Sequence, residues 1–133
     1  MTLIEVLVTL VIMSVGLLGV AALQLTTVRN NYDAFVRSQA AMLASDMLDR
    51  MRANRLQAPG YVAAFGANPN PGGTTAAADV AQWRQALAAQ LPLGVGQIDF
   101  NAATEVVTIS IQWGERNRIE AERTLEFRTS SQI

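Results

Sequence analysis

The chain has 133 residues, half of them hydrophobic, and a formal net charge of −1 at pH 7. It contains no cysteine, histidine or lysine, which excludes disulfides, thiol chemistry and histidine-based triads and removes most zinc sites. The near-neutral charge gives no electrostatic footprint for nucleic acid, so we do not expect nucleic acid as a partner. The acidic residues are scattered and do not converge, so we expect no enzyme, no catalytic residues, no cofactor and no metal site.

The first segment is apolar from Leu3 to Leu25, apart from three uncharged polar residues and a single charge, Glu5. A helix of roughly 20 apolar residues can span a bilayer. A carboxylate at the centre of such a span costs about 2.5–3.5 kcal/mol and less near the interface, so it calls for a functional explanation. We predict a transmembrane or filament-core helix over residues 1–28.

Three interpretations of this segment compete. A secretory signal peptide would begin with basic residues, but none precedes Arg29. A plain membrane anchor gives no reason for Glu5. An assembly helix does, because its apolar surface would face lipid before assembly and similar helices afterwards. Glu5 would then pair with the N-terminal amine of a neighbouring chain, a group with an unperturbed pKa near 8, if that chain is staggered by about one helical turn.

The first eight residues, MTLIEVLV, resemble the mature N-terminus of type IV pilins and pseudopilins. The resemblance implies that a prepilin peptidase cuts before Met1, that the new N-terminus is methylated and that Glu5 directs stacking into a filament. It also implies a single-pass protein of the inner membrane with a periplasmic domain before assembly, and an extracellular pilus filament after it. Met1 stands where phenylalanine is commonest in that family.

The helical pattern continues beyond the span. Asp33 and Arg37, like Asp46 and Arg50, are acid-before-base pairs four residues apart, each contributing a few tenths of a kcal/mol. We expect the helix to continue to about residue 55 and to need a cover over one apolar stripe. The stripe consists of Tyr32, Val36, Ala40, Leu43, Met47 and Met51.

The run from Asp46 to Arg55, together with the GLLG sequence at residues 16–19, resembles the PilV-type minor pilins, or type IV pilus modification proteins. That resemblance implies a minor pilin that works with other minor pilins and the major pilin, and a tip adhesin as a further partner. Four charged residues are candidate contacts with such partners, although a charge network at the helix end, with Asn54 as the helix stop, is the favoured explanation for the last three of them. They are Asp46, Asp49, Arg50 and Arg52.

Residues 57–78 are rich in proline and glycine and predict a surface loop. A second helix is expected over residues 79–91, with Asp79 as N-cap, Gln82 three residues on and Trp83 on its apolar face until Pro92 ends it.

From residue 95 the hydrophobic period changes to two, which predicts a three-stranded antiparallel meander over residues 95–129, with turns at 101–104 and 114–118. The third strand is expected to begin near Ile119, with Arg123 interrupting its inner face. The predicted fold is α+β and pilin-like: a long N-terminal helix, transmembrane in its first half, packed on the sheet beside a second short helix. Residues 29–133 would form the periplasmic globular domain.

Three functions remain open at this stage. The first is a minor pilin that primes or caps a type IV pilus. The second is a minor pseudopilin of a type II secretion system, which shares the N-terminus and the layout. The third is a tip subunit that binds DNA or a surface, for which the arginines at 116, 118 and 123 are a thin argument.

Overall fold

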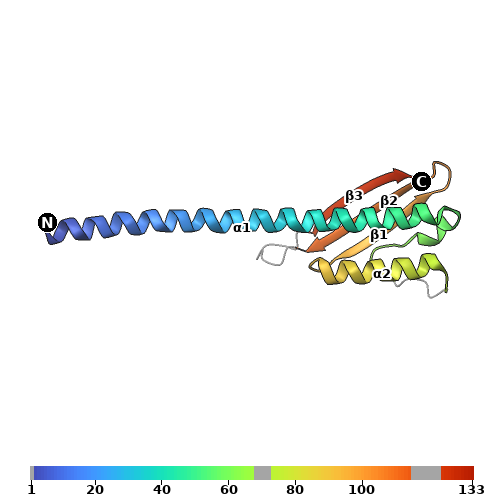
Figure 1. Ribbon diagram of the computed structural model, residues 1–133, viewed down its shortest axis with the longest axis horizontal. Helices are drawn as coiled ribbons and strands as arrows, with labels where there is room; N and C mark the ends of the chain where they lie inside the picture. Colours follow the sequence, from blue (N-terminus) through green and yellow to red (C-terminus); the bar gives the residue numbers. More distant parts are fainter. Residues whose placement is uncertain (1, 68–72, 115–123) are drawn as a thin grey trace. The chain divides into compact units, whose positions relative to one another are not determined.

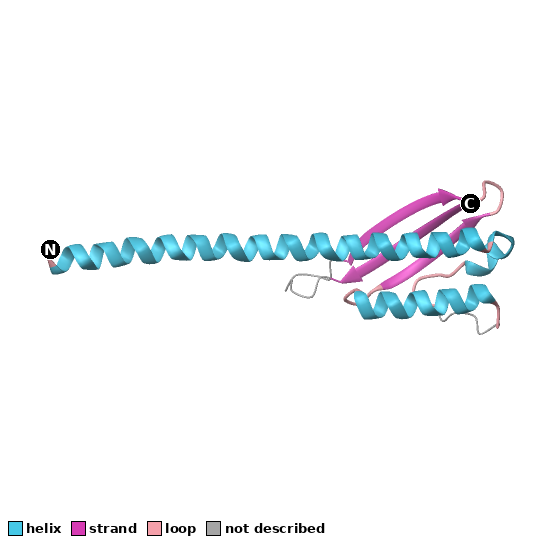
Figure 2. Ribbon diagram, in the orientation of Figure 1, coloured by secondary structure: helices cyan, strands magenta, loops and turns pink. Residues whose placement is uncertain are grey.

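The computed structural model describes residues 2–67, 73–114 and 124–133, and it confirms the α+β, pilin-like class. Two compact units divide at Phe35 and Val36, and the longest helix contributes to both. Figures 1 and 2 show the elements in chain order. They are α1 (Leu3–Ala53), a 3-10 segment η1 (Arg55–Tyr61), α2 (Thr75–Gln90), β1 (Val95–Asn101), β2 (Val106–Gly114) and β3 (Thr124–Gln132).

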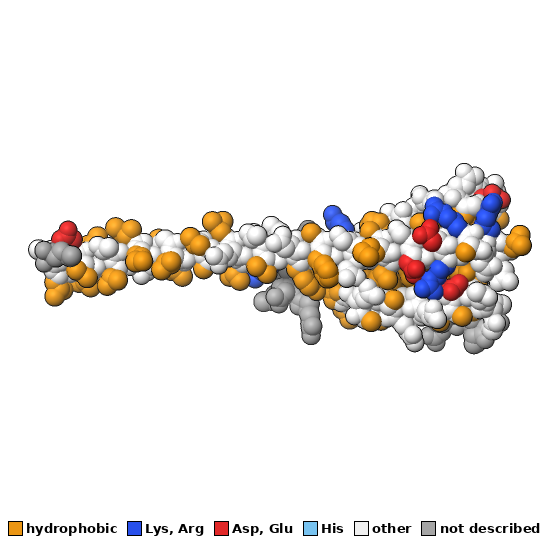
Figure 3. Space-filling model, in the orientation of Figure 1, with side chains coloured by type: hydrophobic (Ala, Val, Ile, Leu, Met, Phe, Trp, Pro, Cys, Tyr) orange, Lys and Arg blue, Asp and Glu red, His pale blue; other side chains and the backbone are white. Residues whose placement is uncertain are grey.

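The first unit consists of the N-terminal part of α1. Every large hydrophobic side chain from Leu3 to Val28 is exposed, and Figure 3 shows such side chains along the visible face of this helix. Among the described residues, α1 alone is long and apolar enough to cross a membrane. An apolar helix surface of this extent has to be covered by lipid or by other helices.

In the second unit, one face of α1 packs on the core, as its apolar period predicts. The buried residues on this face are Val36, Ala40, Leu43, Ala44, Met47, Leu48 and Met51. Tyr32 is the exception to the predicted stripe, because it precedes the second unit and is 57% exposed.

The sheet is an antiparallel meander with the order β1-β2-β3. Its inner face carries Ile98, Ile109 and Ile111, which are fully buried beneath α1 and α2; the two helices lie side by side in Figure 2. The turn after Asn101 forms as predicted, with the Asn101 side chain accepting hydrogen bonds from the amides of Ala103 and Thr104.

The described strands extend the sheet to Gln132, beyond the predicted residue 129. The turn at 114–118, the expected strand start near Ile119 and the interruption at Arg123 lie in residues 115–123, outside the described residues apart from Gly114.

The second helix differs from the prediction at its start. It begins at Thr75, and the side chain of Thr74, not of Asp79, caps it by accepting from the amide of Ala77 at 3.2 Å. The alanines after Thr75 favour helix, and Ala76 is buried in the core. The segment expected to be a loop over 57–78 therefore includes most of η1 and the first turn of α2. Asp79 lies within the helix.

Trp83 is buried, as its place on the apolar face of α2 predicts. Its ring packs against the backbone of β1 at Gly96, where a Cβ atom would overlap the ring. The indole Nε1–H donates to the backbone oxygen of Leu43 at 3.0 Å. Trp83 therefore connects α2 to both α1 and the sheet.

Candidate assembly sites

Glu5 lies in the first turn of α1 and is exposed. A carboxylate at a helix N-terminus interacts favourably with the backbone dipoles. Within the described part of the chain, which does not include Met1, the Glu5 carboxylate makes no ion pair or side-chain hydrogen bond. Its pairing with the N-terminal amine of another chain stays a prediction.

The hydroxyl groups of the apolar helix are satisfied within the helix. Each donates to the carbonyl oxygen four residues earlier: Thr9 to Glu5 at 2.7 Å, Ser14 to Leu10 at 2.7 Å, Thr26 to Ala22 at 3.1 Å and Thr27 to Leu23 at 3.0 Å. Such bonds remove the cost of placing a hydroxyl in lipid or in a dry interface. Glu5 is therefore the single charge that this helix presents before Arg29.

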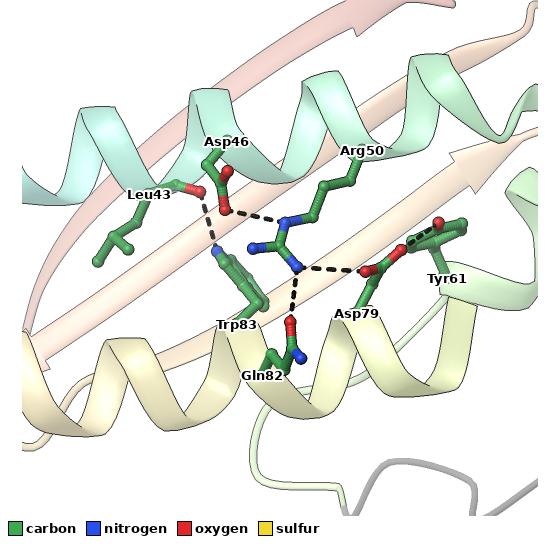
Figure 4. A network of polar contacts seen from close by, with 7 residues as sticks. All are labelled: Leu43, Asp46, Arg50, Tyr61, Asp79, Gln82 and Trp83. Carbon is green, nitrogen blue, oxygen red and sulfur yellow. Dashed lines mark hydrogen bonds and ion pairs between the residues drawn. The ribbon is translucent and has the colours of Figure 1, made fainter. Parts of the chain in front are cut away.

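The four charged residues predicted at the end of α1 separate into two groups. Arg50 points toward α2: its Nε donates to Asp46 at 3.0 Å, and its Nη1 donates to Asp79 at 3.2 Å and to Gln82 at 3.0 Å (Figure 4). Arg50 and Asp79 are 33% and 21% exposed at their side chains. Arg50 thus ties α1 to α2 within the subunit.

Tyr61 extends this network. Its hydroxyl donates to the second carboxylate oxygen of Asp79 at 2.7 Å and accepts from the Asn54 side chain at 3.2 Å. Burial of the phenol, followed by the hydrogen bond to Asp79, raises the pKa of Tyr61 above its usual value. The network holds η1 and α2 against the end of α1.

Arg52 forms the second group. It donates to Asp49 at 2.9 Å and to the Ser131 hydroxyl of β3 at 2.8 Å. Arg52 and Asp49 are 47% and 72% exposed, so solvent screens this pair. Asp46 and Asp49 keep exposed carboxylate surface that a partner can reach. Arg50 and Arg52 therefore take part in a charge network at the helix end. Contact of any of the four residues with a partner stays a prediction.

Sequence reasoning did not identify Asp79, Gln82, Tyr61 or Ser131 as partners of this cluster. Asp79 and Gln82 have the spacing of a capping box, and the sequence alone favours that interpretation. In the structure, both side chains instead accept hydrogen bonds from Arg50. The useful signal was that Asp79, Gln82 and Trp83 fall close together on the surface of one helix. Within residues 2–67, 73–114 and 124–133, no group of three acidic residues gathers as a metal site would require.

Comparison with protein families gives a match to the Tt1218-like family, described as type IV pilin Tt1218, over residues 22–88, just over half of the chain. No curated protein and no solved structure matches the chain. The family agrees with the apolar N-terminal helix and with the α+β domain, and it fits a membrane-anchored subunit with other pilus subunits as partners. The chain belongs to the Tt1218-like family of type IV pilins.

Proposed function

We propose that this type IV pilin is a minor pilin, which joins other minor pilins in a low-abundance complex that primes or caps the pilus. Membership of the pilin family supports a role in filament assembly rather than catalysis. The resemblance of residues 46–55 to PilV-type minor pilins supports the choice of a minor subunit. The major pilin below this complex would be a further partner.

The observation that carries the assembly role is the isolated charge of Glu5 on an otherwise apolar, exposed helix. Before assembly, a carboxylate this close to the helix end can reach the water interface of the membrane. In a filament the helix no longer lies at the interface between membrane and water. An unpaired carboxylate among apolar helices would then be strongly unfavourable, because it would have neither water nor a cation beside it. A cationic amine of a neighbouring subunit would neutralise it.

Processing fits the same scheme. A prepilin peptidase would create the amine at Met1, and methylation would leave that amine able to carry its positive charge. Each subunit would then offer an amine to one neighbour and Glu5 to another. Contacts of this head-to-tail kind build an open filament when the rotation between neighbouring subunits does not close a ring.

Asp46 and Asp49 are proposed as contacts with a neighbouring minor pilin. Both carboxylates are more than half exposed, although each also pairs with an arginine of its own helix. An arginine or lysine of a neighbour could reach them without breaking the contacts between α1 and α2.

The test is the Glu5→Ala variant, expressed in the native host in place of the wild type. We expect normal insertion into the membrane but loss of this subunit from sheared pili and loss of surface piliation. Thr9→Ala is the matched control, because it removes one hydroxyl a single turn away and leaves the charge in place. Normal piliation with Glu5→Ala would refute the proposal, as would a defect confined to protein secretion.

The amount of this subunit in the pilus tests whether it is a minor pilin. Quantitative mass spectrometry of sheared pili should find this subunit far below the major pilin. A comparable amount would mean that it builds the shaft.

A further inference from the structure

β3 is an edge strand with an unbroken ladder on one side only. Its nine residues pair with β2 from Val106↔Gln132 to Gly114↔Thr124, and the amide of Ile133 continues the ladder by donating to the Glu105 oxygen at 3.1 Å. Hydrogen-bonded pairs alternate with non-bonded pairs in an antiparallel ladder. The odd-numbered residues of β3 therefore bond β2, and the backbone groups of Glu126, Arg128 and Ser130 point outward from the sheet.

The opposite edge of the sheet is engaged. The same alternation directs the backbone of Ile98 outward from β1, and there Ala63 bonds it in both directions, at 3.0 and 2.8 Å. In the described part of the chain, no segment bonds β3 in this way. Proteins commonly protect edge strands with proline or a bulge, and β3 has neither.

The side chains of β3 also leave apolar surface uncovered. Leu125 and Phe127 pack on the core but are only partly buried, whereas Ile109 and Ile111 on the neighbouring strand are fully buried. A fourth strand beside β3 would cover the remaining surface of Leu125 and Phe127. On the outer face, the same strand would run past one acid, Glu126, and one base, Arg128.

We propose that the outer edge of β3 binds an extended strand of a different pilin subunit, which adds to the sheet as a fourth strand. This inference rests on the proposed function, which supplies a neighbouring subunit. The added strand carries apolar residues at alternate positions, facing Leu125 and Phe127. Its other face carries a base opposite Glu126 and an acid opposite Arg128, because opposite charges across a strand pair are favourable.

A second copy of this chain does not fit the edge. Antiparallel pairing of two β3 strands would match Glu126 with Arg128 of the other copy, but the two-fold axis relating the copies would turn the parts of α1 that pack on the two sheets, residues 36–53, in opposite directions. Subunits of one filament or one membrane carry these helices in the same direction. Parallel pairing of β3 with the β1 edge of a second copy is blocked by Ala63, because Ala63 already hydrogen-bonds the outward backbone groups of Ile98.

The test distinguishes the effect of a backbone amide of β3 from the effect of its side chain. Ser130→Pro removes one outward amide and places a ring on the open edge, yet it leaves the ladder to β2 intact because that ladder does not use this amide. Ser130→Ala is the matched control, since it shortens the side chain and keeps the amide. The full chain is expressed in the native host, and its amount in sheared pili is measured against the membrane fraction.

We expect Ser130→Pro to reduce the pilus-to-membrane ratio by roughly tenfold or more, the effect of a lost hydrogen bond together with a steric block, and Ser130→Ala to leave it unchanged. Equal incorporation of the two variants overturns the inference. If thermal melting of the purified full chain in detergent shows that Ser130→Pro does not fold, Arg128→Glu decides instead. It should lower the ratio several-fold through repulsion of the added strand, and an unchanged ratio overturns the inference.

Two further outcomes have a defined meaning. Exclusion of Glu5→Ala from pili combined with normal incorporation of Ser130→Pro refutes the edge inference and leaves the proposed function standing. A stable dimer of the purified full chain that Ser130→Pro dissociates would assign the edge to a second copy and overturn the choice of partner.

Discussion

The two arginines at the end of α1 should differ sharply in their contribution to stability. Arg50 makes two bonds from one nitrogen to α2, at a site where its partner Asp79 is 21% exposed. Hydrogen bonds to charged groups contribute about 1.5–3 kcal/mol, and partial exposure reduces this value. We therefore expect a coupling energy of about 1.5 kcal/mol between Arg50 and Asp79. For Arg52 and Asp49, an exposed pair three residues apart, we expect about 0.2–0.5 kcal/mol.

The assay is a pair of double-mutant cycles on the fragment that begins at residue 29. Each cycle uses alanine at one residue, at the other and at both, and the free energy of unfolding is taken from urea titrations. Asp49 and Arg52 provide the matched control, because they also form an arginine–aspartate pair at the end of α1, at 2.9 Å against 3.2 Å for Arg50 and Asp79, but are more exposed. Equal coupling energies in the two cycles would refute the claim that the partly buried contact of Arg50 with Asp79 contributes more to stability than the exposed pair of Arg52 and Asp49.

Three further predictions concern the same domain. Gly96→Ala should destabilise it by about 1–3 kcal/mol in urea titrations, because the new methyl group overlaps the Trp83 ring; an unchanged midpoint would contradict this packing. Trp83→Phe should cost about 1–3 kcal/mol, because the Leu43 oxygen loses its indole donor and the smaller ring leaves space. The pKa of Tyr61 is raised on folding. The contribution of the Tyr61 phenol to the free energy of unfolding is therefore fully present below the unfolded pKa of about 10, and it is lost as pH rises through the folded pKa. Tyr61→Phe should therefore flatten the fall in stability above about pH 10, and an identical slope in the two proteins would contradict the raised pKa of the buried phenol.

Local periodicity was sufficient for much of the fold. The stripe from Val36 to Met51 and the alternation from Val107 to Trp113 each follow the period of one element, so they identify the faces that are buried. Tyr32 has the same helical phase but is exposed, because period alone does not say where the covering sheet ends.

The parts that the sequence did not reveal depend on contacts between distant segments. The sequence around Asp79 fits the pattern of a helix cap. The residues that Asp79 contacts in the structure, Arg50 and Tyr61, are 29 and 18 residues away in the chain. The open edge of β3 follows from the strand order and from Ala63 on the other edge, neither of which a local pattern specifies. Glu5 was identifiable because one charge in an apolar run is a local signal.

The hydroxyl bonds of the N-terminal helix have a consequence for how a pilin changes its surroundings. Since Thr9, Ser14, Thr26 and Thr27 donate to carbonyls of their own helix, none of them has to exchange a partner when lipid is replaced by protein or protein by lipid. Apart from Glu5, moving this helix between lipid and protein therefore exchanges one set of apolar contacts for another. The cost of such a transfer is thereby concentrated in the one charge that the helix carries before Arg29, Glu5.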